Sequence, residues 1–94
     1  MTKVTVTRTT SKGVKLDAQI DNEDLTFKND KAIVELDAGE QALTWQVVGK
    51  KGDTYSIDLE SEDGASCSGS SPEGGLDNTG ADEGGCKFVI TGGD

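Results

Sequence analysis

Oxygen-bearing side chains gather in residues 77–85, at the end of a stretch, residues 61–85, that is rich in glycine and serine and has no basic residue. Hard cations such as calcium bind clustered oxygen ligands on a backbone flexible enough to surround them. Asp77, Asp82 and Glu83 are therefore the candidate metal ligands. The segment lacks the alternating acids and the distal glutamate of an EF-hand loop, and it matches no calcium-binding repeat. A solvated loop without a ligand and a loop that becomes ordered against a protein or carbohydrate partner are the alternatives.

The chain has two cysteines, Cys67 and Cys86. Neither has a histidine to activate it, and the Cys-x-x-Cys spacing of redox enzymes is missing. An even pair in a small domain rich in glycine and serine is typical of a disulfide in an oxidising, extracytoplasmic compartment. Such a bridge would stabilise the fold by about 3 kcal/mol in the chain-entropy treatment. Two reduced thiols in a cytoplasm are the alternative, and the N-terminal residues, which lack the apolar core of a signal peptide, fit either a cytosolic protein or a fragment of a secreted one.

The inventory of side chains argues against catalysis. The chain has no histidine, which is the commonest general base and metal ligand. Two thiols are too few for a structural zinc site, and the glycine-rich stretch lacks the lysine of a phosphate-binding loop. A pair of carboxylates for glycoside cleavage would need aromatic subsites, and the chain has few aromatic residues. We therefore expect a protein that is not an enzyme.

The charge of the chain restricts its partners. Eighteen acidic and 9 basic residues give a formal net charge of −9. Nucleic acids and anionic membrane surfaces repel such a field, whereas cationic partners and divalent metals remain open. An acidic surface also keeps a protein in solution without any partner. No apolar run approaches the length of a membrane span, so we expect no membrane insertion, and we expect a monomer.

Apolar and polar residues alternate along the first sixty positions, which predicts strands that bury one face. Residues 4–7 and 14–20 are expected to form an antiparallel hairpin through the turn at residues 10–13. After the long stretch, residues 86–90 form a last strand. The inward-facing sets expected for the seven strands are Val4 and Val6; Val14, Leu16, Ala18 and Ile20; Leu25 and Phe27; Ala32, Val34 and Leu36; Leu43, Trp45 and Val47; Tyr55, Ile57 and Leu59; and Cys86, Phe88 and Ile90.

These strands predict an all-β fold. About seven short antiparallel strands, each with one apolar face, pack as a two-sheet β-sandwich, with a small β-barrel as the alternative. A chain of 94 residues makes one domain, residues 1–94. Residues 61–85 are too poor in apolar groups to bury much surface, so they are expected to form a long surface loop.

The aromatic residues are expected in the core. Trp45 is in phase with Leu43 and Val47, so its indole should face inward. An exposed platform that stacks on a sugar ring would need Trp45 on the opposite face of the strand. Tyr55 is also expected inward, with its hydroxyl reaching a polar partner at the sheet edge.

Part of the chain resembles a known kind of domain. Ala38-Gly39-Glu40, Leu43-Thr44-Trp45, Val47, Gly49, Gly52 and Tyr55-Ser56-Ile57 together resemble a stretch of small immunoglobulin-like β-sandwich modules of bacterial secreted and surface proteins. The resemblance implies a non-catalytic, extracytoplasmic module and identifies no binding residues. In antibody-type domains the tryptophan lies between the two bridging cysteines, whereas Trp45 precedes both. The cysteine pair is therefore expected to tie the long loop to the last strand instead of joining sheet to sheet.

The first hypothesis is a structural or adhesion-type interaction module that uses the disulfide-closed, acidic residues 61–85 as its contact surface. An exposed edge strand could also pair with a strand of a partner. The second hypothesis is a calcium-binding module that bridges to a carbohydrate, and no other cofactor is expected. The third is a cytosolic acidic domain without a ligand, and a thiol count separates it from the other two. The sequence leaves the identity of any partner, the strand order and the residues that bind a partner open.

Overall fold

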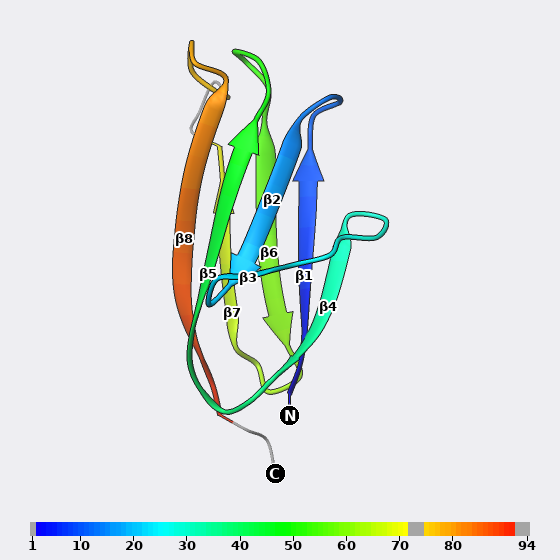
Figure 1. The fold of residues 1–94 in the computed structure, drawn as a ribbon, viewed down its shortest axis with the longest axis vertical. Helices are drawn as coiled ribbons and strands as arrows, with labels where there is room; N and C mark the ends of the chain where they lie inside the picture. Colours follow the sequence, from blue (N-terminus) through cyan, green and yellow to red (C-terminus); the bar gives the residue numbers. More distant parts are fainter. Residues whose placement is uncertain (1, 72–74, 92–94) are drawn as a thin grey trace.

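The computed structural model describes residues 2–71 and 75–91, which form two antiparallel sheets of four strands each and no helix. In the first sheet the strand order is β4-β1-β6-β7, and in the second it is β3-β2-β5-β8 (Figure 1). The predicted all-β, two-sheet sandwich is confirmed. The strands are β1 (Thr2–Thr10), β2 (Lys15–Ile20), β3 (Glu23–Asp24), β4 (Lys31–Leu36), β5 (Gly39–Val48), β6 (Tyr55–Ser61), β7 (Ser66–Ser70) and β8 (Ala81–Ile90).

The core lies between the two sheets and follows the alternation of the sequence. On β5, Leu43, Trp45 and Val47 are buried while their neighbours face outward, so the inward placement of Trp45 is confirmed. Tyr55 is buried in the same core. Ile33, by contrast, points outward from β4 and is 60% exposed. The buried hydrophobic residues are Val4, Val6, Leu16, Ala18, Ile20, Ala32, Leu43, Trp45, Val47, Tyr55, Ile57, Leu59, Leu76, Phe88 and Ile90.

The predicted hairpin between the first two strands is wrong. β1 pairs with β4 and β6 in one sheet, whereas β2 pairs with β3 and β5 in the other. The turn between β1 and β2, which includes Gly13 at a φ of 87°, therefore carries the chain from one sheet to the other. Each of these strands has one apolar face, and stacking the two faces across the core buries both, which pairing side by side in one sheet would not do.

The prediction that residues 61–85 form one long surface loop is also wrong. β7 lies within this stretch, and β8 begins at Ala81. In β7 the serines face outward while Cys67 and Gly69 face inward. This strand has little apolar surface, and it is held by its pairing with β6 and by contacts of Cys67 and Gly69 with the other sheet. The described residues thus hold eight strands and not seven. Leu25 and Phe27 pack against the core outside any strand, because the strand before them is the short β3.

Arg8 closes the sandwich on the side of β3 and β4. Its Nη1 donates a hydrogen bond to the carbonyl oxygen of Leu16 at 2.8 Å, which links β1 to β2 across the two sheets. Its Nε lies 3.0 Å from Oδ1 of Asp30, and its guanidinium carbon lies 4.4 Å from the ring centre of Phe27. One half-buried guanidinium therefore stabilises this side through a carbonyl, a carboxylate and an aromatic face.

The strands run along the long axis of the molecule, which measures 46 × 22 × 20 Å. The start of β1 and the end of β8 lie at the same end of the sandwich, and the turns after β1 and β5 lie at the other (Figure 1). Among the described residues, no helix is long and apolar enough to cross a membrane.

Candidate functional site

The edge strands β7 and β8, one from each sheet, face each other and form what we call the β7–β8 seam, with Cys67, Gly69, Gly84 and Cys86 as its inward residues. Cys67 and Cys86 form a disulfide with a Cα–Cα distance of 6.3 Å. The predicted bridge is confirmed, but the expectation that it ties a loop to the last strand is wrong, since it joins the two sheets. The reason is that β7 is a strand of the first sheet and not part of a loop.

Trp45 fills the space under the seam. Its indole reaches between the inward positions of Gly69 and Gly84, one on each edge strand. A Cβ atom added at Gly69 would lie 2.6 Å from Cη2 of the indole, and one added at Gly84 would lie 2.7 Å from Cζ2. Only glycine fits at either position, because real Cβ contacts of this length do not occur in close-packed interiors.

A chain of buried hydrogen bonds continues from Trp45 along the core. Nε1 of Trp45 donates to the hydroxyl of Tyr55 at 3.2 Å, and that hydroxyl donates to Oδ2 of Asp82 at 2.7 Å. Burial, and next the hydrogen bond to Asp82, raise the pKa of Tyr55 above its ordinary value of 10.0. The chain links β5, β6 and β8, and it leaves no buried side-chain polar atom of the described residues without a partner.

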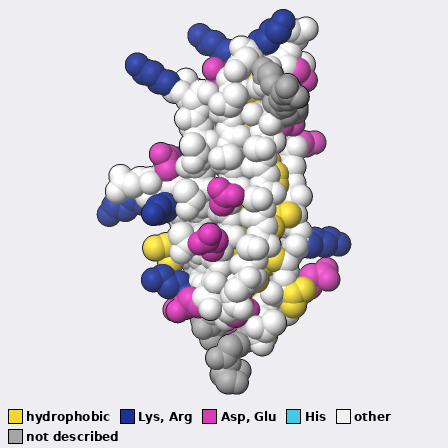
Figure 2. All heavy atoms as spheres, turned by 180° about the vertical axis from the view of Figure 1, so that it is seen from behind, with side chains coloured by type: hydrophobic (Ala, Val, Ile, Leu, Met, Phe, Trp, Pro, Cys, Tyr) yellow, Lys and Arg dark blue, Asp and Glu magenta, His cyan; other side chains and the backbone are white. Residues whose placement is uncertain are grey.

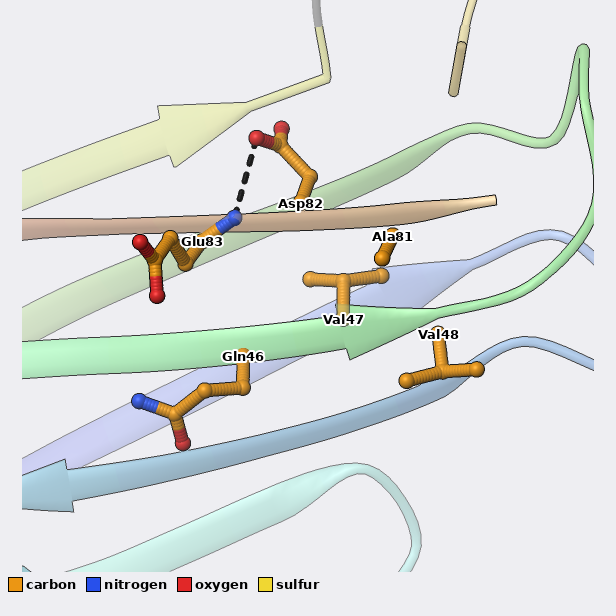
Figure 3. Close-up of a pocket in the computed structure, with 6 residues that line it drawn as sticks. All are labelled: Gln46, Val47, Val48, Ala81, Asp82 and Glu83. Carbon is orange, nitrogen blue, oxygen red and sulfur yellow. Dashed lines mark hydrogen bonds between the residues drawn. The ribbon is translucent and has the colours of Figure 1, made fainter. Parts of the chain in front are cut away.

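The three candidate metal ligands do not converge. Asp77 is exposed in the turn before β8, where its Oδ1 accepts a hydrogen bond from the amide of Thr79 at 2.9 Å. Hydrogen bonds from the Thr79 side chain and amide lower the pKa of Asp77. Asp82 turns inward to Tyr55, and Glu83 turns to the outer face of the sheet (Figure 3). The described residues hold no group of three potential ligands close enough to share a metal ion. A calcium site built on Asp77, Asp82 and Glu83 therefore finds no support in the geometry.

The outer face of β5 and β8 has shallow, open depressions, one of which is shown in Figure 3. The floor and walls of this depression are formed by Gln46, Val47, Val48, Ala81, Asp82 and Glu83. Val48 is 59% exposed on this face. A depression this open does not enclose a small molecule, because ligand pockets are concave sites that bury most of the ligand surface.

β8 is the last strand of its sheet, and among residues 2–71 and 75–91 no strand pairs with its second edge. The amide of Gly49 donates to the carbonyl of Gly80 at 2.6 Å, and these two residues stand opposite each other in the β5–β8 register. Hydrogen-bonded pairs recur at every second residue of an antiparallel ladder, so the even-numbered residues of β8 bond to β5. The backbone N–H and C=O groups that face away from β5 belong to Ala81, Glu83, Gly85, Lys87 and Val89. Two of these amides already donate within the chain: the amide of Glu83 to Oδ1 of Asp82 at 2.9 Å (Figure 3) and the amide of Ala81 to Oγ1 of Thr79 at 3.4 Å.

Asp63 links the two sheets at the end of the seam where β6 turns into β7 and β8 ends. Its Oδ2 accepts hydrogen bonds from the amide of Thr91 at 2.7 Å and from the hydroxyl of Thr91 at 3.0 Å, just after β8. Its Oδ1 accepts hydrogen bonds from the Ser61 hydroxyl and from the amide of Ala65, within the turn between β6 and β7. The Ser61 hydrogen bond first, and then the two amides, hold the pKa of Asp63 well below its usual range. One carboxylate therefore joins the first sheet to the end of the second.

The sequence contains a signal for the seam that the composition concealed. Serine alternates with Cys67 and Gly69 from Ser66 to Ser70 with a period of two, as in a strand. Glycine and serine are poor strand formers, so composition outweighed this alternation in the sequence-based prediction. Searches for relatives add no further signal, because no protein-family model, curated protein or solved structure matches the chain.

Proposed function

We propose that this chain is a non-catalytic interaction module of the adhesion type whose contact surface is the β7–β8 seam. The observation that carries the proposal is the disulfide between the edge strands of the two sheets, beside the free edge of β8. A bridge at this place holds both edges in one arrangement, and a preorganised edge loses less entropy when a partner binds. The contact surface is therefore a pair of stapled strands and not an acidic loop.

The polar groups of the seam support a non-catalytic role. Trp45 donates to Tyr55 and Tyr55 donates to Asp82, while the Asp63 carboxylate accepts hydrogen bonds from Thr91 and from the β6–β7 turn. A general acid or base must be within reach of a bound substrate, whereas these groups are used in internal hydrogen bonds. The absence of histidine from the whole chain supports the same conclusion.

The disulfide also supports an extracytoplasmic location, because such bridges persist in oxidising compartments. A sheet-to-sheet bridge next to a buried tryptophan supports the resemblance to immunoglobulin-like modules, in which a tryptophan packs on an inter-sheet disulfide. The bridge here joins edge strands. A thiol titration of protein freshly isolated from its native compartment is expected to find no free thiols, and two free thiols would favour a cytosolic domain instead.

The test of the interaction role is retention of coated beads. Beads that carry the oxidised domain are passed over immobilised extracellular proteins, polysaccharides and the domain itself. We expect retention on at least one surface, competed by an excess of the soluble domain. Beads that carry a variant with Cys67→Ala and Cys86→Ala serve as the matched control and should be retained less. Equal passage of both bead types over every surface would contradict the proposal.

A further inference from the structure

β8 presents a long edge without a bulge or a proline. Its register with β5 runs without interruption from Gly39 opposite Ile90 to Val48 opposite Ala81, so no bulge twists the edge away. β8 contains no proline. Natural sheet proteins protect long edges with bulges, prolines or charged side chains, and β8 has only the charged side chains, with Glu83 and Lys87 on its outer face. Asp82, near the first end of β8, is its one inward-pointing charge, and Tyr55 already occupies it.

The residues along this edge have a self-complementary order. From one end to the other, the positions whose backbone groups face outward carry an apolar residue, an acid, a glycine, a base and an apolar residue: Ala81, Glu83, Gly85, Lys87 and Val89. The same residues point their side chains to the outer face of the sheet, where Glu83 and Lys87 are exposed. An antiparallel copy of this strand reverses the order, so acid meets base and base meets acid.

We infer that β8 is a homotypic docking edge, to which a second copy of this chain adds its own β8 in antiparallel orientation with Gly85 on the two-fold axis. This inference rests on the proposed function and names the partner. In this register Glu83 stands opposite Lys87 of the second copy, and Ala81 stands opposite Val89 of the second copy. Every pair falls on residues whose N–H and C=O groups face the edge, so all are hydrogen-bonded pairs. In them the amides of Ala81 and Glu83 exchange their side-chain acceptors, Thr79 and Asp82, for carbonyls of the second copy. The interface is isologous and closes as a dimer.

The surroundings of the edge leave room for the second copy. Gly85 has no side chain on the axis, and β7, which lies under β8 in the other sheet, carries only serine, cysteine and glycine. In Figure 2, hydrophobic side chains reach the surface in a row along the right-hand side of the molecule. Because this view is turned by 180°, that side is the left-hand side of Figure 1, where β8 lies. Val89, at this edge, is 57% exposed. Pairing of two β8 strands covers apolar surface as well as backbone groups.

The present ion pair of Lys87 does not compete strongly. Its Nζ lies 3.9 Å from Oε1 of Glu40, and both side chains are largely exposed. Exposed pairs at this distance contribute little to stability. Glu83 has no ion pair within the described residues. Lys87 can therefore turn to the second copy at little cost, and cross-strand pairs of opposite charge stabilise antiparallel strands.

The test is a charge exchange measured by sedimentation equilibrium of the oxidised domain at physiological salt, where the mutual repulsion of two acidic molecules is screened. The wild type is expected to dimerise with increasing concentration. Glu83→Lys and Lys87→Glu each place like charges opposite each other twice, so each should weaken the dimer about tenfold. The double variant, with both substitutions, should recover it. Glu60→Lys, on the outer face of the other sheet, changes the net charge as Glu83→Lys does and should leave the dimer intact.

Amide exchange by NMR locates the interface. In the dimer, the amides of Gly85, Lys87 and Val89 should gain protection with concentration, whereas those of Gly84 and Cys86, already bonded to β5, should not change. A monomer at all concentrations, a dimer insensitive to both charge reversals, or protection elsewhere would overturn the inference. Beads retained on another protein or on a polysaccharide, with a monomeric free domain, would leave the proposed function standing and remove this partner.

Discussion

The hydroxyl of Tyr55 donates a hydrogen bond of 2.7 Å to the carboxylate of Asp82 and so joins the first strand position of β6 to the inner face of β8. The same hydroxyl accepts the indole N–H of Trp45. This link crosses between the sheets, as the Cys67–Cys86 bridge does, and lies near the opposite end of the seam from Asp63. The two sheets are thus linked at three levels of the seam, by a disulfide and by hydrogen bonds to two carboxylates.

Tyr55→Phe should destabilise the protein by about 1–3 kcal/mol, because it leaves the indole N–H of Trp45 and the carboxylate of Asp82 without their buried partner. Urea unfolding followed by the fluorescence of Trp45, the only tryptophan, measures the loss. Asp82→Asn keeps an oxygen acceptor for the tyrosine and should cost less. If Tyr55→Phe unfolds at the same urea concentration as the wild type, the hydrogen-bond chain contributes nothing.

The raised pKa of Tyr55 predicts a loss of stability in alkaline solution. Because the folded state binds the phenolic proton more tightly than the unfolded state, whose value is near 10.0, the stabilisation is complete below that pH. It is lost as the pH rises through the higher value of the folded protein. Tyr55 is the only tyrosine, so ultraviolet absorbance of the phenolate reports its titration directly. Tyr55→Phe should show a weaker decline of the unfolding midpoint in the same pH range, since the variant lacks the phenolic proton.

The buried faces of the strands could be predicted from the sequence, but the order of the strands in the two sheets could not. The period-two patterns around Leu43 and Ile57 were sufficient to place Trp45 and Tyr55 inside. The same patterns say which face of a strand is buried and not which strand lies beside it, so the first two strands were assigned to one hairpin although they belong to opposite sheets. Which distant strands become neighbours depends on how the apolar faces of all the strands pack together in the core.

The seam could not be predicted because its residues are small. Gly69 and Gly84 have no apolar side chain. Their role is to leave space for the indole of Trp45, which belongs to a strand far away in the sequence. The composition of residues 61–85 therefore indicated a loop. The candidate metal ligands were close in sequence, but Asp82 and Glu83 are consecutive residues of a strand and point to opposite faces.

Gly84→Ala should destabilise the protein by about 1–3 kcal/mol, since the added methyl group overlaps the indole of Trp45 and the packed core has no space for it. Ser68→Ala, on the outer face of β7, adds no volume to the core and serves as the control. Thermal unfolding measures both. Combining Gly84→Ala with Trp45→Phe should reduce the penalty of the alanine, because the smaller ring leaves the space free. Additive losses would show that the clash lies elsewhere.

The lowered pKa of Asp63 predicts that the end of β8 loses order in acid. The folded pKa of Asp63 lies below the ordinary aspartate value of 3.8, so its contribution to stability is complete above that value and disappears as the pH falls through the lower, folded pKa. Protonation weakens the hydrogen bonds from Thr91 and Ala65, and the end of β8 should then separate from the β6–β7 turn. The amide resonances of Thr91 and Ala65 are expected to shift together as the pH falls through this lower, folded pKa. Asp63→Asn should show no such transition, whereas independent titration of the two amides would contradict a shared carboxylate.

Removal of the bridge by Cys67→Ala and Cys86→Ala should lower the free energy of unfolding by about 3 kcal/mol, as expected for a bridge with a sequence separation of 19 residues. The methyl groups keep the inward positions apolar, so the loss measures the cross-link more than the packing. Wild-type protein reduced by a thiol should show the same urea midpoint as the double variant, and Ser68→Ala should remain at the value of the oxidised wild type. Because β7 is short and is held in its sheet by β6 alone, its amides should lose hydrogen-exchange protection before those of β1 and β5, each of which lies between two strands. Uniform loss of protection across both sheets would instead mean that the bridge stabilises the whole sandwich and not the seam.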